Sequence, residues 1–245
     1  MATDNCIQCS THGDAFATYI CEHLADNHNQ RWFCDYPSEE NRWPDAWCEQ
    51  CDVEFRREGE WNERNEDKLR VKLLCNHCHE DAIGSSVSCM EPSILQSWTA
   101  EADRCYAALC EKQDILETAF SLSKHKRWDY DQETGLLVFS NDGVPAVFAE
   151  IEMIGSVSNK TDTWLWSWAN FHFLENVRTC ITAVRDHGET HGYSYLTVPK
   201  WPADEDMGWG VSAVAVQVLD AKGVYRVPSG SGFLFMAITA IRYAT

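Results

Sequence analysis

Two cysteine pairs with the same short spacing constrain this chain more than any other feature. Cys48 and Cys51 form one Cys-x2-Cys pair, Cys75 and Cys78 form a second, and 23 residues separate the two pairs. Such a turn places two sulfurs on one edge of a tetrahedron, and a hairpin-sized insertion can return the second pair. The spacing therefore predicts a four-cysteine zinc ribbon. Because four thiolates close the coordination shell, we expect a structural zinc ion.

A second group of candidate ligands lies nearer the N-terminus: Cys6, Cys9, His12, Cys21 and His23. Two ligand sets are open, which differ in whether Cys6 or His12 joins the other three residues. Gly13 favours His12, because a glycine directly after a ligand can turn the chain away from the metal. A third arrangement, also left open, has Cys6 and Cys9 share an ion with one of the later pairs. The favoured assignment gives eight metal ligands: Cys9, His12, Cys21, His23, Cys48, Cys51, Cys75 and Cys78.

The first ninety residues lack the apolar content that normally supports a folded domain. They contain only ten Ile, Leu or Val residues among many charged and amide side chains. Apolar burial alone cannot offset the entropy of ordering such a segment. Structural zinc contributes about 10–16 kcal/mol in small motifs. We therefore expect two zinc ions to hold residues 1–90 together, with His77 and His79 solvated and Cys34 outside both sites.

Residues 91–245 change in character and predict a second domain. Apolar residues at helical spacing after Pro92 predict a long helix or helix pair. The final segment is apolar on both faces, which places it in the centre of a sheet. The expected helices cover 93–123, 174–186 and 211–219, and the expected strands cover 128–131, 136–139, 147–154, 163–170, 224–227 and 233–243. The chain is thus expected to be α+β, with a small zinc-stapled module followed by a mostly antiparallel sheet packed with helices.

Three tryptophans alternate along one expected strand, at Trp164, Trp166 and Trp168. A strand would place all three on one face. We favour the interpretation that they form the core beneath the helices. The alternative is a platform on which a planar ligand stacks. Its rim would then carry one of three histidines: His172, His187 or His191.

The segment from His187 to His191 does not match a catalytic metal motif. It lacks the His-Glu-x-x-His order of zinc proteases. Gly188 is expected to end the preceding helix, and a histidine at a helix C-terminus is favourable through the helix dipole alone. We therefore expect no catalytic or cofactor site at this position.

The charge of the chain bears on its partners and its location. Acidic residues outnumber basic ones by 38 to 20, which gives a net charge of −18. Residues 1–127 carry 13 basic and 24 acidic side chains, and the remainder 7 and 14, so both parts are acidic. We expect no nucleic-acid or anionic membrane partner.

The location of the protein is predicted from its apolar segments. The N-terminus lacks a signal pattern, and the longest apolar run, 233–241, is shorter than the roughly 20 residues of a membrane span. We therefore expect a cytoplasmic protein.

Two passages resemble known families. The segment Trp164-Leu165-Trp166-Ser167-Trp168-Ala169-Asn170, with the preceding Ile154-Gly155-Ser156, resembles the hallmark of a bacterial domain family of unknown function, over about residues 98–245. The Cys/His pairs of residues 9–78 resemble small, uncharacterised bacterial Cys/His-rich proteins, and that resemblance favours His12 over Cys6. Neither family implies an activity. The resemblances imply a bacterial origin and a two-part layout of the chain.

The sequence favours a non-enzymatic role while leaving an enzymatic one open. Closed metal sets and the lack of a convincing catalytic constellation favour a zinc-stabilised interaction protein, and the acidic surface suits a basic protein partner. The alternative is an enzyme or small-ligand-binding protein with a pocket beside the Trp164, Trp166 and Trp168 strand.

Overall fold

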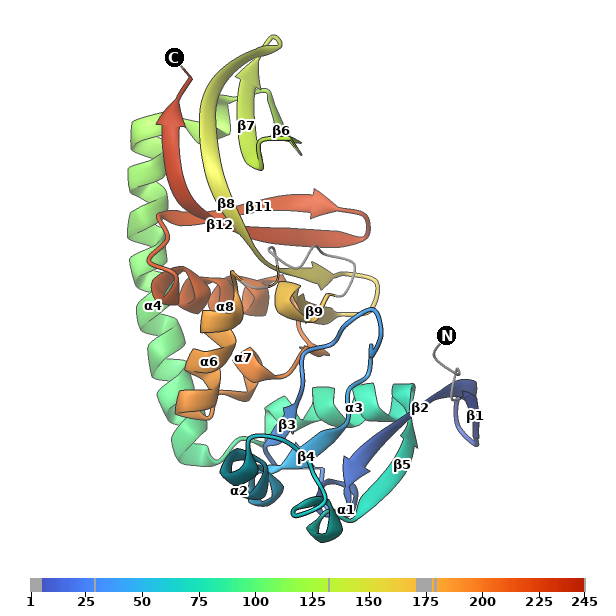
Figure 1. Ribbon diagram of the computed structural model, residues 1–245. Coiled ribbons are helices and arrows are strands. Elements are labelled where there is room, and N and C mark those ends of the chain that lie inside the picture. The colour runs from blue at the N-terminus through green and yellow to red at the C-terminus, as the bar shows by residue number, and fades with distance from the viewer. Residues whose placement is uncertain (1–5, 29, 132, 171–177, 179, 245) are drawn as a thin grey trace.

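The computed structural model describes residues 6–28, 30–131, 133–170, 178 and 180–244. Its N-terminal part is a small sheet edged by short helices, shown in blue and teal in Figure 1. The elements of this part are β1 (Cys6–Cys9), β2 (Gly13–Cys21), α1 (Glu22–Asp26), β3 (Trp32–Cys34), β4 (Ala46–Cys48), α2 (Glu49–Glu58), β5 (Val71–Cys75) and α3 (Asn76–Ser86), with 3-10 turns at Glu66–Lys68 and Val87–Cys89. We call residues 6–90 the module.

Strand β2 organises the module because three other strands pair with it. The first half of β2 pairs with β1 and the second half with β5, both antiparallel. On its other edge β2 meets β4 in parallel, through Ile20 and Ala46, and β4 pairs with β3. Strands β2, β4 and β5 each lead directly into a helix, which places helix N-termini at their ends.

The C-terminal part is a second, larger sheet flanked by helices. Its strands are β6 (Arg127–Asp131), β7 (Leu136–Asn141), β8 (Val144–Ser158), β9 (Thr163–Trp166), β10 (Lys200–Pro202), β11 (Gly223–Ser229) and β12 (Gly232–Tyr243). Its helices are α4 (Pro92–Phe120), α6 (Thr182–His191), α7 (Ser194–Thr197) and α8 (Glu205–Val218), with 3-10 turns at Leu122–Lys124 and Ser167–Ala169. Every pairing in this sheet is antiparallel. The predicted α+β class is confirmed.

Strand β12 lies between β8 and β11, as its two apolar faces predict. Strand β8 is long enough to pair with β12 on one edge and with both β7 and β9 on the other. Helix α4 runs along the side of the molecule (Figure 1) and buries Trp98, Cys105, Leu109 and Leu116 from one helical face. Among the described residues, no helix combines the length and apolar character needed to cross a membrane.

Two sequence-based expectations about local structure were wrong. Strand β9 ends at Trp166, and Trp168 lies on the following 3-10 turn instead of in the same strand. Gly188 lies inside α6, which ends at Gly192 with φ of 75°. A Cβ on Gly188 would lie 2.5 Å from the Cβ of Leu196, so this glycine serves close packing of α6 on α7 and not helix termination. The start of the expected helix over 174–186 falls partly outside the described residues.

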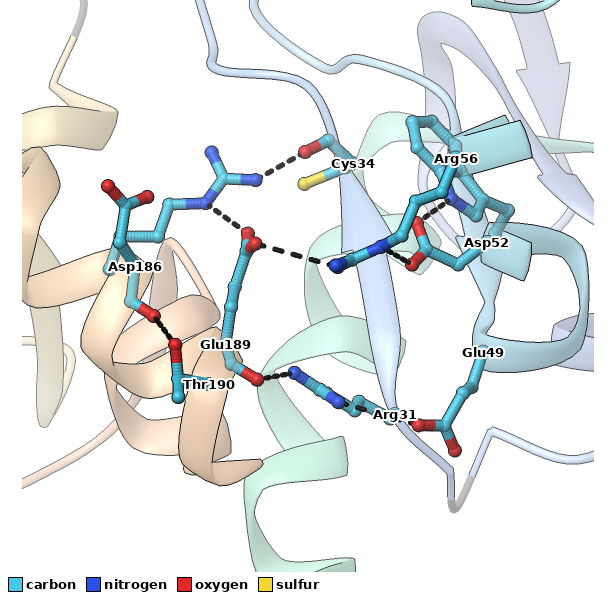
Figure 2. Close-up of polar contacts among 10 residues, drawn as sticks. Arg31, Cys34, Glu49, Asp52, Arg56, Asp186, Glu189 and Thr190 are labelled. Atoms are coloured by element: carbon cyan, nitrogen blue, oxygen red, sulfur yellow. Dashed lines mark hydrogen bonds and ion pairs between the residues drawn. The ribbon is translucent and has the colours of Figure 1, made fainter. Parts of the chain in front are cut away.

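A polar network joins α6 to the module, and Figure 2 shows Glu189 at its centre. The guanidinium of Arg185 donates to the carbonyl oxygen of Cys34 at 2.5 Å and to the Glu189 carboxylate at 3.3 Å. Arg56 of α2 approaches the other carboxylate oxygen of Glu189 at 3.8 Å, and Arg31 donates to the Glu189 carbonyl oxygen. One acidic side chain of the C-terminal part thus meets basic residues from both parts. Buried apolar residues of both parts also form one continuous cluster.

Replacing Arg185 by leucine is expected to destabilise the protein by about 2–4 kcal/mol, because a buried Cys34 carbonyl and the Glu189 carboxylate lose their donor. Arg185 is 6% exposed, and its guanidinium lies 4.0 Å from the ring centroid of Tyr36 and 5.0 Å from that of Trp168. Urea unfolding measures the loss. The matched control is Arg104→Leu in α4, since the Arg104 side chain is 62% exposed. Equal stability of the two variants would contradict the role of Arg185 at this junction.

Candidate metal centres

Cys9, His12, Cys75 and Cys78 form the first group that could hold a metal ion. The Nδ1 atom of His12 lies 3.8 Å from Sγ of Cys9, 3.4 Å from Sγ of Cys75 and 3.5 Å from Sγ of Cys78. The sulfurs of Cys9 and Cys78 are 3.9 Å apart. Three sulfurs and one nitrogen therefore surround one point.

Cys21, His23, Cys48 and Cys51 form the second group. The Nδ1 atom of His23 lies 3.6 Å from Sγ of Cys48 and 3.4 Å from Sγ of Cys51. Cys21, Cys48 and Cys51 are buried, whereas His23 is exposed. This group also consists of three sulfurs and one nitrogen, so the two groups are alike in donor set.

These separations fit the edges of a zinc tetrahedron. With Zn–S bonds of about 2.3 Å and Zn–N bonds of about 2.0–2.1 Å, a tetrahedral site has sulfur–sulfur edges of about 3.8 Å and sulfur–nitrogen edges of about 3.5–3.6 Å. The sulfur–nitrogen distances in both groups run from 3.4 to 3.8 Å. Four ligand atoms at these separations complete the shell, as in structural zinc sites.

The grouping of the cysteine pairs differs from the predicted zinc ribbon. The pair Cys48 and Cys51 joins the second group, and the pair Cys75 and Cys78 joins the first, so the four cysteines do not share an ion. In chain order the four pairs are Cys9 with His12, Cys21 with His23, Cys48 with Cys51, and Cys75 with Cys78. Their grouping is nested: the first pair lies with the fourth, and the second pair lies with the third. The structure adopts none of the three open arrangements in full: Cys9 does lie with a later pair, but its neighbour in the group is His12 and not Cys6.

Strand register explains the nested pairing. Antiparallel pairing of β2 with β5 sets Ala17 opposite Cys75, which brings Cys75 toward the β1–β2 hairpin that carries His12. The parallel contact of Ile20 with Ala46 brings the end of β2, at Cys21, beside the end of β4, at Cys48. The two ends of β2 therefore serve different metal groups.

Helix starts supply three of the four ligand pairs. Cys21, Cys48 and Cys75 are the residues directly before α1, α2 and α3, and the second ligand of each pair lies in the first turn. The backbone N–H of Cys78 donates to Sγ of Cys75 at 3.3 Å. A helix N-terminus favours a thiolate over a thiol, which suits a cation ligand. The fourth pair, Cys9 and His12, lies in a hairpin.

Cys9 and His12, in the hairpin between β1 and β2, are positioned by a turn and not by a helix start. Gly13 directly after His12 has a φ of +74°, a conformation that favours glycine, and it is the first residue of β2. Backbone N–H groups of Thr11 and His12 lower the pKa of the Cys9 thiol to about 6. On the side of the ring away from the sulfurs, Nε2 of His12 lies 3.8 Å from a carboxylate oxygen of Asp81, which is longer than a hydrogen bond.

Burial, together with neighbouring thiols, raises the pKa of Cys78 and of Cys51. Burial, followed by hydrogen bonds from Cys75 and Cys9, raises the pKa of Cys78 to about 12. Burial, followed by the neighbouring Cys21 and Cys48, raises the pKa of Cys51. Packing several thiols together therefore disfavours their thiolates unless a cation takes the place of the protons, which is the usual coupling between a zinc site and its fold.

Residues 99–241 match the profile of the Family of unknown function (DUF6882). This match covers more than half of the chain. The chain belongs to this family. No curated protein and no solved structure matches it. The matched segment runs from within α4 to within β12, so the DUF6882 match leaves the two candidate metal groups outside, in the residues before it.

Within the DUF6882 segment, the three tryptophans are core residues. Trp164, Trp166 and Trp168 are each 0% exposed, which confirms the core interpretation and excludes a stacking platform on these indoles. Gly155 of β8 faces Trp164, because a Cβ there would lie 2.5 Å from the indole ring. Close packing thus accounts for this glycine in the Ile154-Gly155-Ser156 segment.

Two of the three histidines proposed for a rim, His187 and His191, lie beside each other on α6. The Nε2–H group of His187 donates to a carboxylate oxygen of Glu101 at 3.0 Å, and the ring centroids of His187 and His191 are 4.2 Å apart. His172 lies outside the described residues. His77 is exposed as predicted, but His79 is only 4% exposed, so the expectation that it is solvated was wrong.

Proposed function

We propose that this protein is a non-enzymatic, zinc-stabilised interaction protein whose module binds a partner protein. Each candidate metal group has four protein ligands, which leaves no coordination position for a substrate. Among the described residues, no further group of three or more metal-binding side chains occurs. The proposal includes the expectations, from sequence alone, of a bacterial origin and a cytoplasmic location.

An exposed apolar face on β2 and β5 is the observation that carries this proposal. Tyr19 and Leu73 are register partners, so their side chains share one face, and they are 37% and 50% exposed. Val71, two residues before Leu73, lies on the same face and is 52% exposed. The module contains few aliphatic residues, yet two of them, Val71 and Leu73, are exposed to solvent on this face. Adjacent exposed apolar side chains are typical of a binding surface.

The outer edge of β5 also favours a partner-binding surface at this place. Among the described residues, β5 pairs with β2 alone, so its outer edge has unpaired backbone groups. Edge strands of this kind can accept an extended segment of a partner. Residues 1–90 carry 18 acidic and 8 basic side chains, a net charge of −10, which suits a basic partner.

Affinity capture from an extract of the native host tests the proposal. Immobilised zinc-loaded protein is expected to retain a stoichiometric partner, and Leu73→Glu is expected to lose it because a charge is placed in the centre of the apolar face. Val53→Glu is the matched control, since Val53 is 63% exposed on α2, which lies on the other side of the module from β5 in Figure 1. Absence of a stoichiometric partner, or equal retention by both variants, would contradict the proposal.

A further inference from the structure

A pocket lies where α3 of the module meets the DUF6882 part of the chain. It has a cavity volume of about 120 Å³. Its lining comes from both parts and is mostly apolar, with Pro44 and Ile83 from the module, and Leu165, Ala169 and Pro199 from the second part. It borders the segment of the three tryptophans through Leu165 and Ala169, whereas the indoles themselves are buried in the core.

His79 gives this pocket a polar group that lacks a partner. The ring is 4% exposed and lines the pocket, and neither Nδ1 nor Nε2 has a hydrogen-bond partner. Its one described ring contact is edge-on with Trp32, at 5.6 Å between centroids. Buried polar groups are nearly always hydrogen-bonded, and one that is not calls for a ligand or an ordered water.

Three charged residues line the pocket, Arg42, Glu80 and Lys200, and each already has a partner. The Glu80 carboxylate accepts from Nε1 of Trp43 at 2.7 Å and from Nζ of Lys200 at 3.4 Å. A charged ligand would have to break this pair, and apolar walls disfavour a charge. The pocket therefore suits an uncharged occupant that is mostly apolar and carries one hydrogen-bonding group.

The size of the pocket limits that occupant to about one ring. An engineered apolar cavity of about 150 Å³ holds a benzene molecule, whereas pockets for larger ligands measure about 300–1,000 Å³. A neutral imidazole offers one N–H donor and one bare nitrogen acceptor, and a hydroxyl group can satisfy either of them. We infer that this pocket binds a phenol group, with its ring against Ile83 and Leu165 and its hydroxyl hydrogen-bonded to His79.

This site is separate from the partner-binding face on β2 and β5, so either proposal can fail without the other. The phenol can come from a free small molecule or from a tyrosine side chain of another protein. Both sources present the same ring and hydroxyl to His79. Probes of each kind distinguish them.

Binding of p-cresol and of toluene to the full-length, zinc-loaded protein tests the inference. NMR signals of the His79 ring and of the Ile83 and Leu165 methyl groups are expected to shift saturably with p-cresol. In His79→Phe, affinity for p-cresol is expected to fall about tenfold while that for toluene does not fall, since only p-cresol loses a hydrogen bond. The comparison isolates the contact between hydroxyl and imidazole.

Leu165→Trp is the second variant, because it fills the pocket from a half-buried position and leaves His79 in place. It is expected to abolish binding of both probes, with zinc content and far-ultraviolet circular dichroism unchanged.

N-acetyl-tyrosinamide is a third probe, which distinguishes the two sources of the phenol. If it binds as p-cresol does, the phenol is a tyrosine side chain; if it is excluded, the phenol is a small molecule. Either result agrees with the inference.

Three results would overturn it. The first is no saturable shift with p-cresol, which would leave an ordered water as the partner of His79. The second is an equal loss of p-cresol and toluene affinity in His79→Phe. The third is unchanged p-cresol binding in Leu165→Trp.

Discussion

Replacing Cys48 by serine is expected to unfold the module and release one of two zinc ions. Cys48 is 1% exposed, belongs to the second candidate metal group and is the residue directly before α2. Structural zinc contributes about 10–16 kcal/mol in small motifs, which is as large as the stability of a typical domain, about 5–15 kcal/mol. Zinc analysis and limited proteolysis measure the two effects.

Cys6→Ser is the matched control for this substitution. Cys6 is exposed and belongs to neither group, although the sequence left it as a candidate ligand. The control is expected to keep both zinc ions and the protease resistance of the unsubstituted protein. Retention of two zinc ions and a folded module by Cys48→Ser would show that apolar packing, and not the metal, holds this part together.

Replacing Trp164 by alanine is expected to destabilise the DUF6882 part by about 3–5 kcal/mol, the usual cost of emptying a large buried site. Its ring is fully buried, with centroids 5.1 Å from Trp166, 5.5 Å from Phe235 and 6.4 Å from Trp201. Urea unfolding monitored by circular dichroism measures the change.

An exposed aromatic residue provides the control for Trp164→Ala. Tyr106 of α4 is 46% exposed, so Tyr106→Ala is expected to change stability by no more than about 0.5 kcal/mol. A loss below about 1 kcal/mol for Trp164→Ala would contradict the assignment of the tryptophan row to the core.

Local sequence patterns predicted which residues could bind metal but not how they group. Cys-x2-Cys spacing and Gly13 are local signals, and the same eight residues form the two groups. Their grouping depends on the register of β2 with β4 and β5, which joins residues up to 69 positions apart. A sequential grouping was the simpler assumption, and short-range spacing carries no information on strand order.

The remaining differences have the same physical origin. A glycine at position 188 predicts the end of a helix from local preference alone. In the structure Gly188 is instead required by its close packing against Leu196. His79 follows a candidate ligand in a polar stretch, yet it is buried beside Trp32, at a pocket lined by both parts of the chain. Arg185 has no sequence signal that distinguishes it from a surface arginine. In each case a long-range contact outweighs the local preference.

Cadmium-113 NMR of the metal-exchanged protein separates the nested grouping from the sequential one. Bulk sulfur and nitrogen counts cannot do so, because both groupings use six cysteines and two histidines in total. The cadmium chemical shift increases with the number of bound thiolates. The nested grouping predicts two resonances, both in the range of three sulfurs and one nitrogen. One resonance in the four-sulfur range with another in the two-sulfur, two-nitrogen range would contradict it.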